Sequence, residues 1–224
     1  MKNKKKKRMM YGSIAAVAFL VLLFYFLQTY WAHRKFHDTK GATECVPLLG
    51  MFTMEDQLKE GKHELTQLQP GDILITLSTH SMGWRHGHAG LVIDEYTVLE
   101  SVTLGTCSEL CSTKHWEKYS NCVVLRIKGI TPEEQKAVAQ YAMENLVDIR
   151  YRLLAGVIGD KAPGADGKNF GVQCGYLVWY AWYQMGYDLD SDGGKLVTVH
   201  DLLHSDQLEV IQIFGMDDNR NPIQ

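Results

Sequence analysis

The stretch Arg85-His-Gly-His-Ala-Gly-Leu-Val-Ile-Asp-Glu-Tyr-Thr-Val-Leu-Glu-Ser101 contains two apolar runs with a short polar break at residues 94–97 between them. Two β-rich runs around such a break predict a β-hairpin. His88 begins the first run and Glu100 ends the second, and a hairpin places residues of its two strands side by side. Whether the two side chains share a face depends on the register of the turn. On a shared face they would form the orienting half of a catalytic triad, which still needs a nucleophile.

The composition is that of one domain of ordinary size with an appendage. The chain has 224 residues, of which 46% are hydrophobic, and a formal net charge of −3. Many of the basic residues lie in one block, Lys2 to Arg8, and the others form no stripe. The composition therefore gives no support to nucleic-acid binding, and we expect no nucleic-acid partner.

The basic block precedes a charge-free apolar run, residues 9–27, which is close to the roughly 20 residues that a bilayer-spanning helix needs. Tyr30 and Trp31 follow it, where aromatic residues prefer the membrane interface. We therefore predict a basic cytoplasmic tail over residues 1–8 and a transmembrane signal anchor over residues 9–31, with the rest of the chain extracytoplasmic. The alternative is a cleaved signal peptide, although the apolar core of such peptides is usually only ~7–15 residues long.

Beyond the anchor we expect a juxtamembrane connector over residues 32–61 and one folded domain over residues 62–224. The connector is polar, with glycine and proline breaks and a weak helical pattern at residues 54–59. Residues 103–119 show no regular pattern, and residues 156–171 form a long loop. The expected strands are 73–75, the two arms of the hairpin, 122–127 and 208–214, and the expected helices are 131–147, 174–186 and 199–203. This order indicates an α+β fold in which an antiparallel β-sheet packs against helices.

Cys174 is the best candidate for the nucleophile. It begins a run of helix length that ends at Gly186, a typical C-terminal cap. The positive end of a helix dipole lowers the pKa of a thiol, and the backbone N–H groups there bind an oxyanion. The thiolate would pair with His88, and Glu100 would hold the imidazole. The alternative is a buried structural cysteine, the commonest fate of an unpaired cysteine.

The other cysteines are compatible with an oxidising compartment. An exported domain with five cysteines could oxidise four of them and leave one free. Cys107 and Cys111 are spaced as readily for a disulfide as for ordinary thiols, and the spacing leaves both possibilities open. The remaining cysteines are Cys45, Cys122 and Cys174.

Two further groups of residues favour a structural interpretation over a functional one. Trp179, Trp182 and Tyr183 have helical spacing, which is more typical of a core than of a sugar- or lipid-binding strip. Residues 188–192 contain three alternating aspartates, but they lack the glycine and the distal glutamate of a calcium loop. We interpret them as a solvated turn, and we expect neither a metal nor a cofactor.

Three parts of the chain resemble the NlpC-type papain-like cysteine peptidases and amidases. They are Pro-Gly-Asp-Ile-Leu at 70–74, His-Ala-Gly-Leu-Val at 88–92 with Val-Leu-Glu-Ser at 98–101, and Cys-Gly-Tyr-Leu-Val-Trp-Tyr-Ala-Trp-Tyr-Gln-Met-Gly at 174–186. In the common family the cysteine precedes the histidine, whereas here His88 precedes Cys174. That order resembles the circularly permuted, YiiX-like branch, in which the third residue is commonly a glutamate. The resemblance covers roughly residues 68–214.

The resemblance implies a permuted papain-like fold and assigns a role to each candidate residue. Cys174 would be the nucleophile and its backbone N–H one oxyanion donor. His88 would be the general base and later the general acid, and Glu100 would orient it. Tyr151 is similar to the tyrosine that family members place before the nucleophile to line the substrate site.

The chain departs from the family pattern beside the nucleophile. Gln173 and Gly175 replace the usual aspartate and serine, which leaves the details of the oxyanion site open. His86 lies on the same face of the strand as His88 and could compete as the base, but it lacks the apolar continuation. We interpret His80 and His86 as exposed loop histidines.

These expectations together predict a membrane-anchored, extracytoplasmic cysteine hydrolase that cleaves an amide bond with a Cys-His-Glu triad. Its expected partners are the membrane and a cell-envelope substrate, with cell-wall peptides as the first choice. One alternative is a lipid acyl hydrolase or acyltransferase with the same triad. The other is a catalytically inactive envelope-binding module.

Overall fold

The computed structural model describes residues 14, 16–24, 54–55, 63–80, 86–103, 105–163 and 171–222. The chain divides into two compact units, residues 1–40 and 41–224. In the first unit, residues 14 and 16–24 are helical. Among the described residues, no helix combines the length and the apolarity that crossing a membrane requires. The predicted anchor over residues 9–31 lies largely outside the described residues and stays a prediction, as do the boundaries proposed for the tail and the connector.

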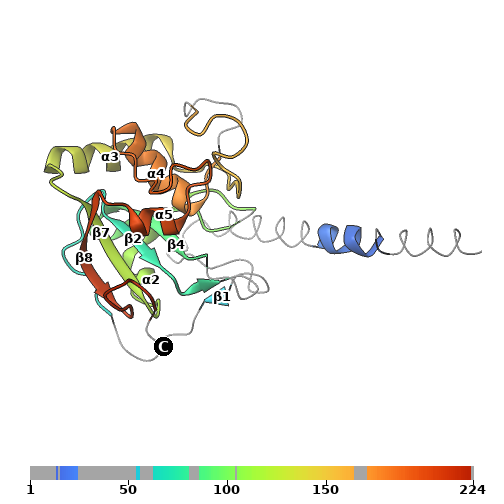
Figure 1. The fold of residues 1–224 in the computed structure, drawn as a ribbon, viewed down its shortest axis with the longest axis horizontal. Coiled ribbons are helices and arrows are strands. Elements are labelled where there is room, and N and C mark those ends of the chain that lie inside the picture. The colour runs from blue at the N-terminus through green and yellow to red at the C-terminus, as the bar shows by residue number, and fades with distance from the viewer. Residues whose placement is uncertain are drawn as a thin grey trace, which may run out of the picture. The chain divides into compact units, whose positions relative to one another are not determined.

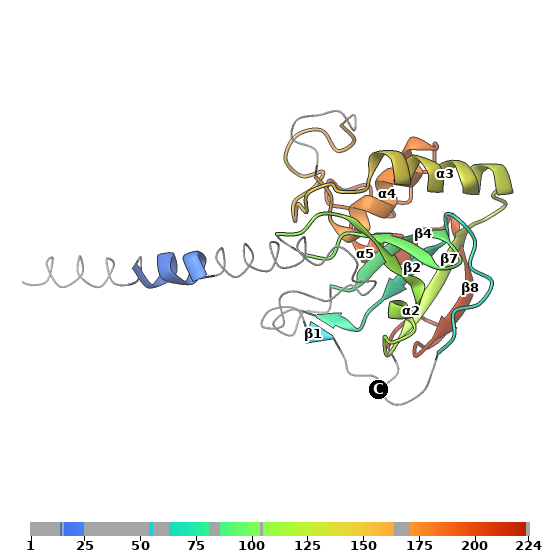
Figure 2. The same ribbon diagram turned by 180° about the vertical axis from the view of Figure 1, so that it is seen from behind.

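The second unit is built on a six-stranded sheet with the strand order β6-β5-β4-β2-β7-β8, in which every neighbouring pair is antiparallel. The strands are β2 (Ile73–Thr76), β4 (His88–Asp94), β5 (Thr97–Glu100), β6 (Glu109–Ser112), β7 (Cys122–Ile127) and β8 (Leu208–Phe214). A separate two-stranded sheet pairs β1 (Met54–Glu55) with β3 (Thr79–His80). The helices are α2 (Thr113–Trp116), α3 (Pro132–Asn145), α4 (Cys174–Gln184) and α5 (Val199–His204). The predicted α+β class, with an antiparallel sheet packed against helices, is confirmed (Figures 1 and 2).

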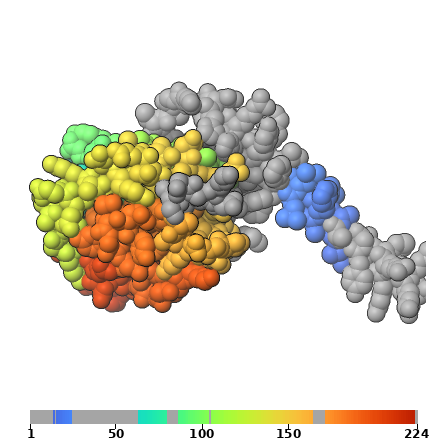
Figure 3. Space-filling view, turned by 90° about the horizontal axis from the view of Figure 1, so that it is seen from above, coloured from blue at the N-terminus to red at the C-terminus, as the bar shows by residue number. Residues whose placement is uncertain are grey.

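Both faces of the sheet are covered, which explains why its central strands are apolar throughout. Ala89 and Leu91 of β4 join the larger core cluster, beneath α3 and α4. Val92 of the same strand joins a smaller cluster on the opposite face, around Trp116 of α2. Helices α3 and α4 lie side by side on the first face, where the space-filling view shows them in yellow and orange (Figure 3).

Local signals place the two long helices as predicted. Thr131 and Glu134 form the capping box that begins α3, so two backbone N–H groups that would otherwise lack partners are satisfied. Helix α4 begins at Cys174, and Gly186 follows its end with a φ of +91°. A left-handed φ strains any residue with a side chain, which is why glycine is common at this position.

Two local predictions are wrong. Residues 103–119 contain β6 and the short helix α2, instead of an irregular segment. Met54 and Glu55 form strand β1 instead of the start of a helix, and the rest of that helical pattern lies outside the described residues. Elements of two to four residues are too short to show a hydrophobic period. Strands β1 and β6 form here because β3 and β5 pair with them, and α2 follows β6 and buries Trp116 in the smaller core cluster.

The aspartate of the Pro-Gly-Asp motif has a structural role. Asp72 is fully buried, and Arg126 of β7 binds its two oxygens at 2.7 and 2.8 Å. Burial raises the pKa of Asp72, and the hydrogen bond from Arg126 opposes that rise. The motif therefore ties the turn before β2 to the neighbouring strand through a bidentate ion pair.

Gly90 allows the smaller core cluster to pack directly against β4. A Cβ atom at this position would lie 2.5 Å from Val98 Cγ1 and 2.9 Å from Trp116 Cζ2. We expect Gly90→Ala to lower the free energy of unfolding by about 1–3 kcal/mol, the usual cost of overpacking, as measured by urea unfolding. Val98→Ala in the same chain removes the closest contact and should recover part of that loss. An unchanged stability of Gly90→Ala alone would contradict the close packing.

Candidate active site

The hairpin places His88 and Glu100 on the same face of the sheet. Gly90 pairs directly with Glu100 across β4 and β5, so His88, two residues earlier, is a diagonal neighbour of the carboxylate. His88 Nε2 lies 2.5 Å from Glu100 Oε2, and both side chains are almost fully buried. The register that the sequence left open therefore brings the imidazole and the acid into a short hydrogen bond.

Trp116 covers this pair. Its ring stacks on the imidazole of His88, with 5.3 Å between centroids and 15° between planes, and it is fully buried. A parallel aromatic ring restricts the rotation of the imidazole, and its π face favours the charged form of histidine. The sequence analysis did not identify Trp116, because nothing in its local pattern links it to His88.

Cys174 is the first residue of α4 and is half-buried. The preceding residue caps the helix, since Gln173 Oε1 accepts a hydrogen bond from the backbone N–H of Gly175 at 2.9 Å. Gln173 Nε2 donates to the carbonyl of Val197, which holds the cap in place. The unusual Gln173 is therefore a helix cap that leaves the N–H of Cys174 itself for a ligand.

Gly175 is explained by the close approach of two helix ends. A Cβ at this position would lie 2.9 Å from the carbonyl carbon of Thr198 and 3.0 Å from the nitrogen of Val199. A serine at this position, as in the NlpC-type enzymes that the sequence resembles, would clash with this backbone. Glycine thus lets α4 and α5 meet at the base of the site.

The sulfur and the imidazole are electrostatically coupled. Burial alone would lower the pKa of His88, but hydrogen bonds to Cys174 and Glu100, together with their charges, outweigh burial and raise the pKa. Burial alone would raise the pKa of Cys174, but His88 and the backbone N–H groups of Ala89 and Gly175 lower it overall. Because Nε2 binds Glu100, Nδ1 is the nitrogen available to the sulfur. The arrangement favours a thiolate beside an imidazolium.

The backbone of Tyr151 lies close to Cys174 in the fold. It forms an isolated parallel bridge with Val172, two residues before Cys174. Arg152 N–H donates to the carbonyl of Val172 at 2.8 Å. The chain between them leaves and returns at the same point, so the long loop predicted for residues 156–171 has its base at the site. The predicted contact of the Tyr151 side chain with a substrate stays a prediction.

The remaining thiols are chemically different from Cys174. Cys111 is disulfide-bonded, whereas Cys107, Cys122 and Cys174 are free. The expectation of four oxidised cysteines is therefore wrong. Burial raises the pKa of Cys107 to about 11, with the charge of Asp148 as the next cause. Burial also raises the pKa of Cys122, so among the described cysteines only Cys174 has a lowered pKa.

The structural interpretations of the aromatic residues of α4 and of the two other histidines, His80 and His86, are confirmed only in part. Trp179 and Trp182 are core residues, as predicted, but Tyr183 is exposed. His86 is half-buried, and its Nδ1 lies 2.8 Å from the carbonyl of Gly87, so it is not a fully exposed histidine. The side chain of His80 lies outside the described residues.

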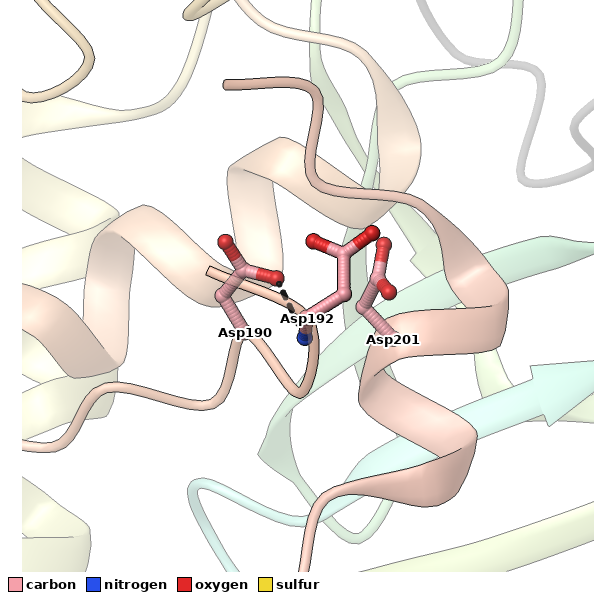
Figure 4. Close-up of side chains that lie close together, drawn as sticks. All are labelled: Asp190, Asp192 and Asp201. Carbon is pink, nitrogen blue, oxygen red and sulfur yellow. Dashed lines mark hydrogen bonds between the residues drawn. The ribbon is translucent and has the colours of Figure 1, made fainter. Parts of the chain in front are cut away.

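The aspartates near residue 190 do not form a simple solvated turn. The carboxylate of Asp190 is buried and paired with Lys161, so that part of the prediction is wrong. Asp190, Asp192 and Asp201 turn their side chains toward one another (Figure 4), with ligand atoms within 4.8 Å. Asp201 accepts hydrogen bonds from the backbone N–H and the hydroxyl of Thr198. Each of the three carboxylates is bound by at least one protein group, and Ser191 of the loop donates to Asp201, so the cluster connects the loop to α5.

Comparison with known proteins supports the fold alone. No profile of a known protein family matches the chain, and no curated protein matches it in sequence. Among solved structures, the chain is similar to the crystal structure of the metalloprotein yiiX from Escherichia coli O157:H7, with 17% identity and a TM-score of 0.50. The likeness covers 65% of this chain and 97% of yiiX. Among the described residues, Asp190, Asp192 and Asp201 form the single group of three or more potential metal ligands. At least one oxygen of each carboxylate is already bound by a protein group, so a metal ion there would compete with these contacts. The chain thus shares an α+β fold with yiiX.

Proposed function

We propose that the chain is a cysteine hydrolase of the permuted papain-like type, with Cys174 as nucleophile, His88 as general base and acid, and Glu100 as the orienting residue. The observation that carries this proposal is the continuous coupling of sulfur, imidazole and carboxylate. The three side chains come from the start of α4, the start of β4 and the end of β5. A lowered thiol pKa at a helix start beside a raised histidine pKa is typical of catalytic cysteines.

The residues support acyl transfer in two steps. The thiolate of Cys174 attacks the carbonyl carbon, and the backbone N–H of Cys174 stabilises the oxyanion. The His88 imidazolium gives its proton to the leaving amine or alcohol as the carbon–heteroatom bond breaks, which leaves a thioester on Cys174. His88 then takes a proton from water, whose oxygen attacks the thioester. Release of the carboxylic acid restores the thiolate and the imidazolium.

The first proposed substrate is an amide bond of cell-wall peptides. The reasons are the resemblance to the NlpC-type amidases and the predicted position of the domain outside the membrane. Both reasons come from the sequence, and hydrolysis of purified cell-wall peptides tests them directly.

A second candidate, a lipid acyl substrate, is favoured by one observation. Leu153, Leu154 and Ile158 are 54%, 49% and 74% exposed, in the loop whose base adjoins Cys174. Exposed aliphatic side chains of this size beside a reactive group are typical of surfaces that meet another apolar body. Gly156, near the start of this loop, packs closely against the carbonyl of Lys195.

The reactivity of Cys174 tests the proposed function without a known substrate. We expect iodoacetamide at pH 6 to alkylate Cys174 at least about tenfold faster than a thiol of ordinary pKa, because an unperturbed thiol with a pKa near 8.5 is roughly 0.3% ionised there. The rate should rise less steeply from pH 6 to 8 than the rate of an ordinary thiol, since the lowered pKa of Cys174 keeps more of it as thiolate at the acidic end of this range. Peptide mapping by mass spectrometry on the full chain in detergent gives the rate at each cysteine.

Cys107 is the control within the same molecule, since it is also free and half-buried but has a raised pKa. Its alkylation should be slow at pH 6 and should rise about tenfold per pH unit. Equal alkylation rates at Cys107 and Cys174 would refute the proposed enzyme and favour a catalytically inactive binding module.

The two substrate classes are separated by parallel digestions. The full chain would be incubated with purified cell-wall peptides and, separately, with phospholipid vesicles. Ile158→Gln should lower lipid hydrolysis and leave peptide hydrolysis unchanged. Met143→Gln, at an exposed position on α3, is the matched control.

A further inference from the structure

A second carboxyl group continues the row of side chains that begins at His88. Glu109 is the direct cross-strand partner of Glu100 on β5 and β6. Paired residues of neighbouring antiparallel strands project to the same face, with Cβ atoms about 4.5–5.5 Å apart. The row therefore crosses three adjacent strands, from the imidazole on β4 through the carboxylate on β5 to Glu109 on β6.

The middle member of this row is only half satisfied. Glu100 is 1% exposed, and its Oε2 binds His88. Its other oxygen, Oε1, is buried and has no hydrogen-bond partner. A buried acceptor without a donor costs about 1–3 kcal/mol, so a neighbouring donor would both lower this cost and fix the orientation of the carboxylate.

We propose that Glu109 is a positioning residue, which acts through Glu100 as the third member of a His88–Glu100–Glu109 row. In its acid form Glu109 supplies a proton toward Glu100 Oε1 and keeps Oε2 turned to His88. The catalytic use of this role rests on the proposed function. The interaction of Glu109 with Glu100 does not, because it follows from strand pairing and can be measured without any substrate.

The charges around Glu109 support the acid form at neutral pH. Burial raises the pKa of Glu109 to about 8, and the negative charge of Glu100 adds to the rise. Cys107 lies two residues before β6 and is bridged to Arg150. Burial, and then the charge of Asp148, raise its pKa to about 11, while the charge of Arg150 opposes the rise. Cys107 therefore stays neutral through this range, and Glu109 is the group of the row that changes charge near pH 8.

The sign of the effect follows from the repulsion of like charges. Below pH 8 Glu109 is protonated and adds no charge beside Glu100. Above pH 8 both groups are negative on directly paired residues, which opposes their proximity and removes the donor for Oε1. We expect Glu100 to loosen its contact with His88 as the pH rises through 8.

The hydrogen bond between His88 and Glu100 provides a spectroscopic signature. A short N–H···O bond moves its proton far downfield in the proton NMR spectrum, and loss of the resonance in His88→Ala assigns it. In the full chain this resonance should lose intensity between pH 7 and 9, with a midpoint near 8. Glu109→Gln should retain it across that range, because the neutral amide still donates. Glu95→Gln, in the exposed turn of the hairpin, should behave as the unmodified chain.

Two results would overturn the proposal. One is constant intensity from pH 7 to 9 in the unmodified chain, and the other is the same loss of intensity in Glu109→Gln. If Glu109→Gln fails to fold, carbon NMR of labelled glutamate in the unmodified chain tests the proposal instead. One glutamate carboxyl should titrate near pH 8, and the absence of such a titration would refute the role of Glu109. If Cys174 is alkylated slowly but the resonance still disappears near pH 8, the proposed function is refuted and the role of Glu109 stands. If Cys174 is alkylated fast but the resonance does not change near pH 8, the role of Glu109 is refuted and the proposed function stands.

Discussion

Replacing His88 with alanine is expected to slow the alkylation of Cys174 at pH 6 by about tenfold or more, and to slow hydrolysis of an acyl substrate by roughly 10²–10⁴-fold. The thiol of Cys174 has a lowered pKa because the hydrogen bond and charge of His88 overcome its burial. Without the imidazole, burial would dominate and the pKa would rise to or above the ordinary value. The thiolate at pH 6 would then be a minor species, and no group would protonate the leaving atom.

Glu100→Gln is the matched variant for this prediction. The amide oxygen can still accept the hydrogen bond from His88 Nε2, but its neutrality removes the charge that raises the pKa of His88. We expect a smaller loss of alkylation than in His88→Ala, with Cys107 unchanged in both. Unchanged reactivity of Cys174 in His88→Ala would refute the coupling of sulfur and imidazole.

Trp116→Ala is expected to lower the free energy of unfolding by about 3–5 kcal/mol, the usual cost of removing a buried tryptophan. Trp116 is fully buried, belongs to the smaller core cluster with Val98, and also stacks edge-on with Tyr119 at 5.3 Å. Urea unfolding followed by circular dichroism measures the change. The substitution should also slow alkylation of Cys174 in the folded protein, because His88 would lose the ring that restricts it.

Trp116→Phe separates the two effects. Phenylalanine retains an aromatic face for His88 and removes a buried indole N–H that has no hydrogen-bond partner, which offsets part of the lost packing. We expect a smaller loss of stability than in Trp116→Ala, and alkylation close to that of the unmodified chain. Fast alkylation in folded Trp116→Ala would show that the stacking does not position His88.

The sequence was sufficient wherever a signal is local. The hairpin around residues 94–97, the capping box at Thr131 and the helix that begins at Cys174 depend on side-chain alternation, caps and turn residues within a few positions of one another. The candidates His88 and Glu100 belong to the same class, because a short hairpin brings its own arms together. The general α+β architecture follows from the order of such elements.

Tertiary structure alone decided what depends on residues distant in sequence or on short elements. Strand β6 forms because β5 offers a pairing edge, and helix α2 follows it directly. Together they bring Glu109 and Trp116 to the hairpin. The meeting of Cys174 with His88 also requires α4 to pack across the end of the sheet, 86 residues further along the chain (174 − 88). Local patterns carry no information about such contacts, since packing of the whole core sets them.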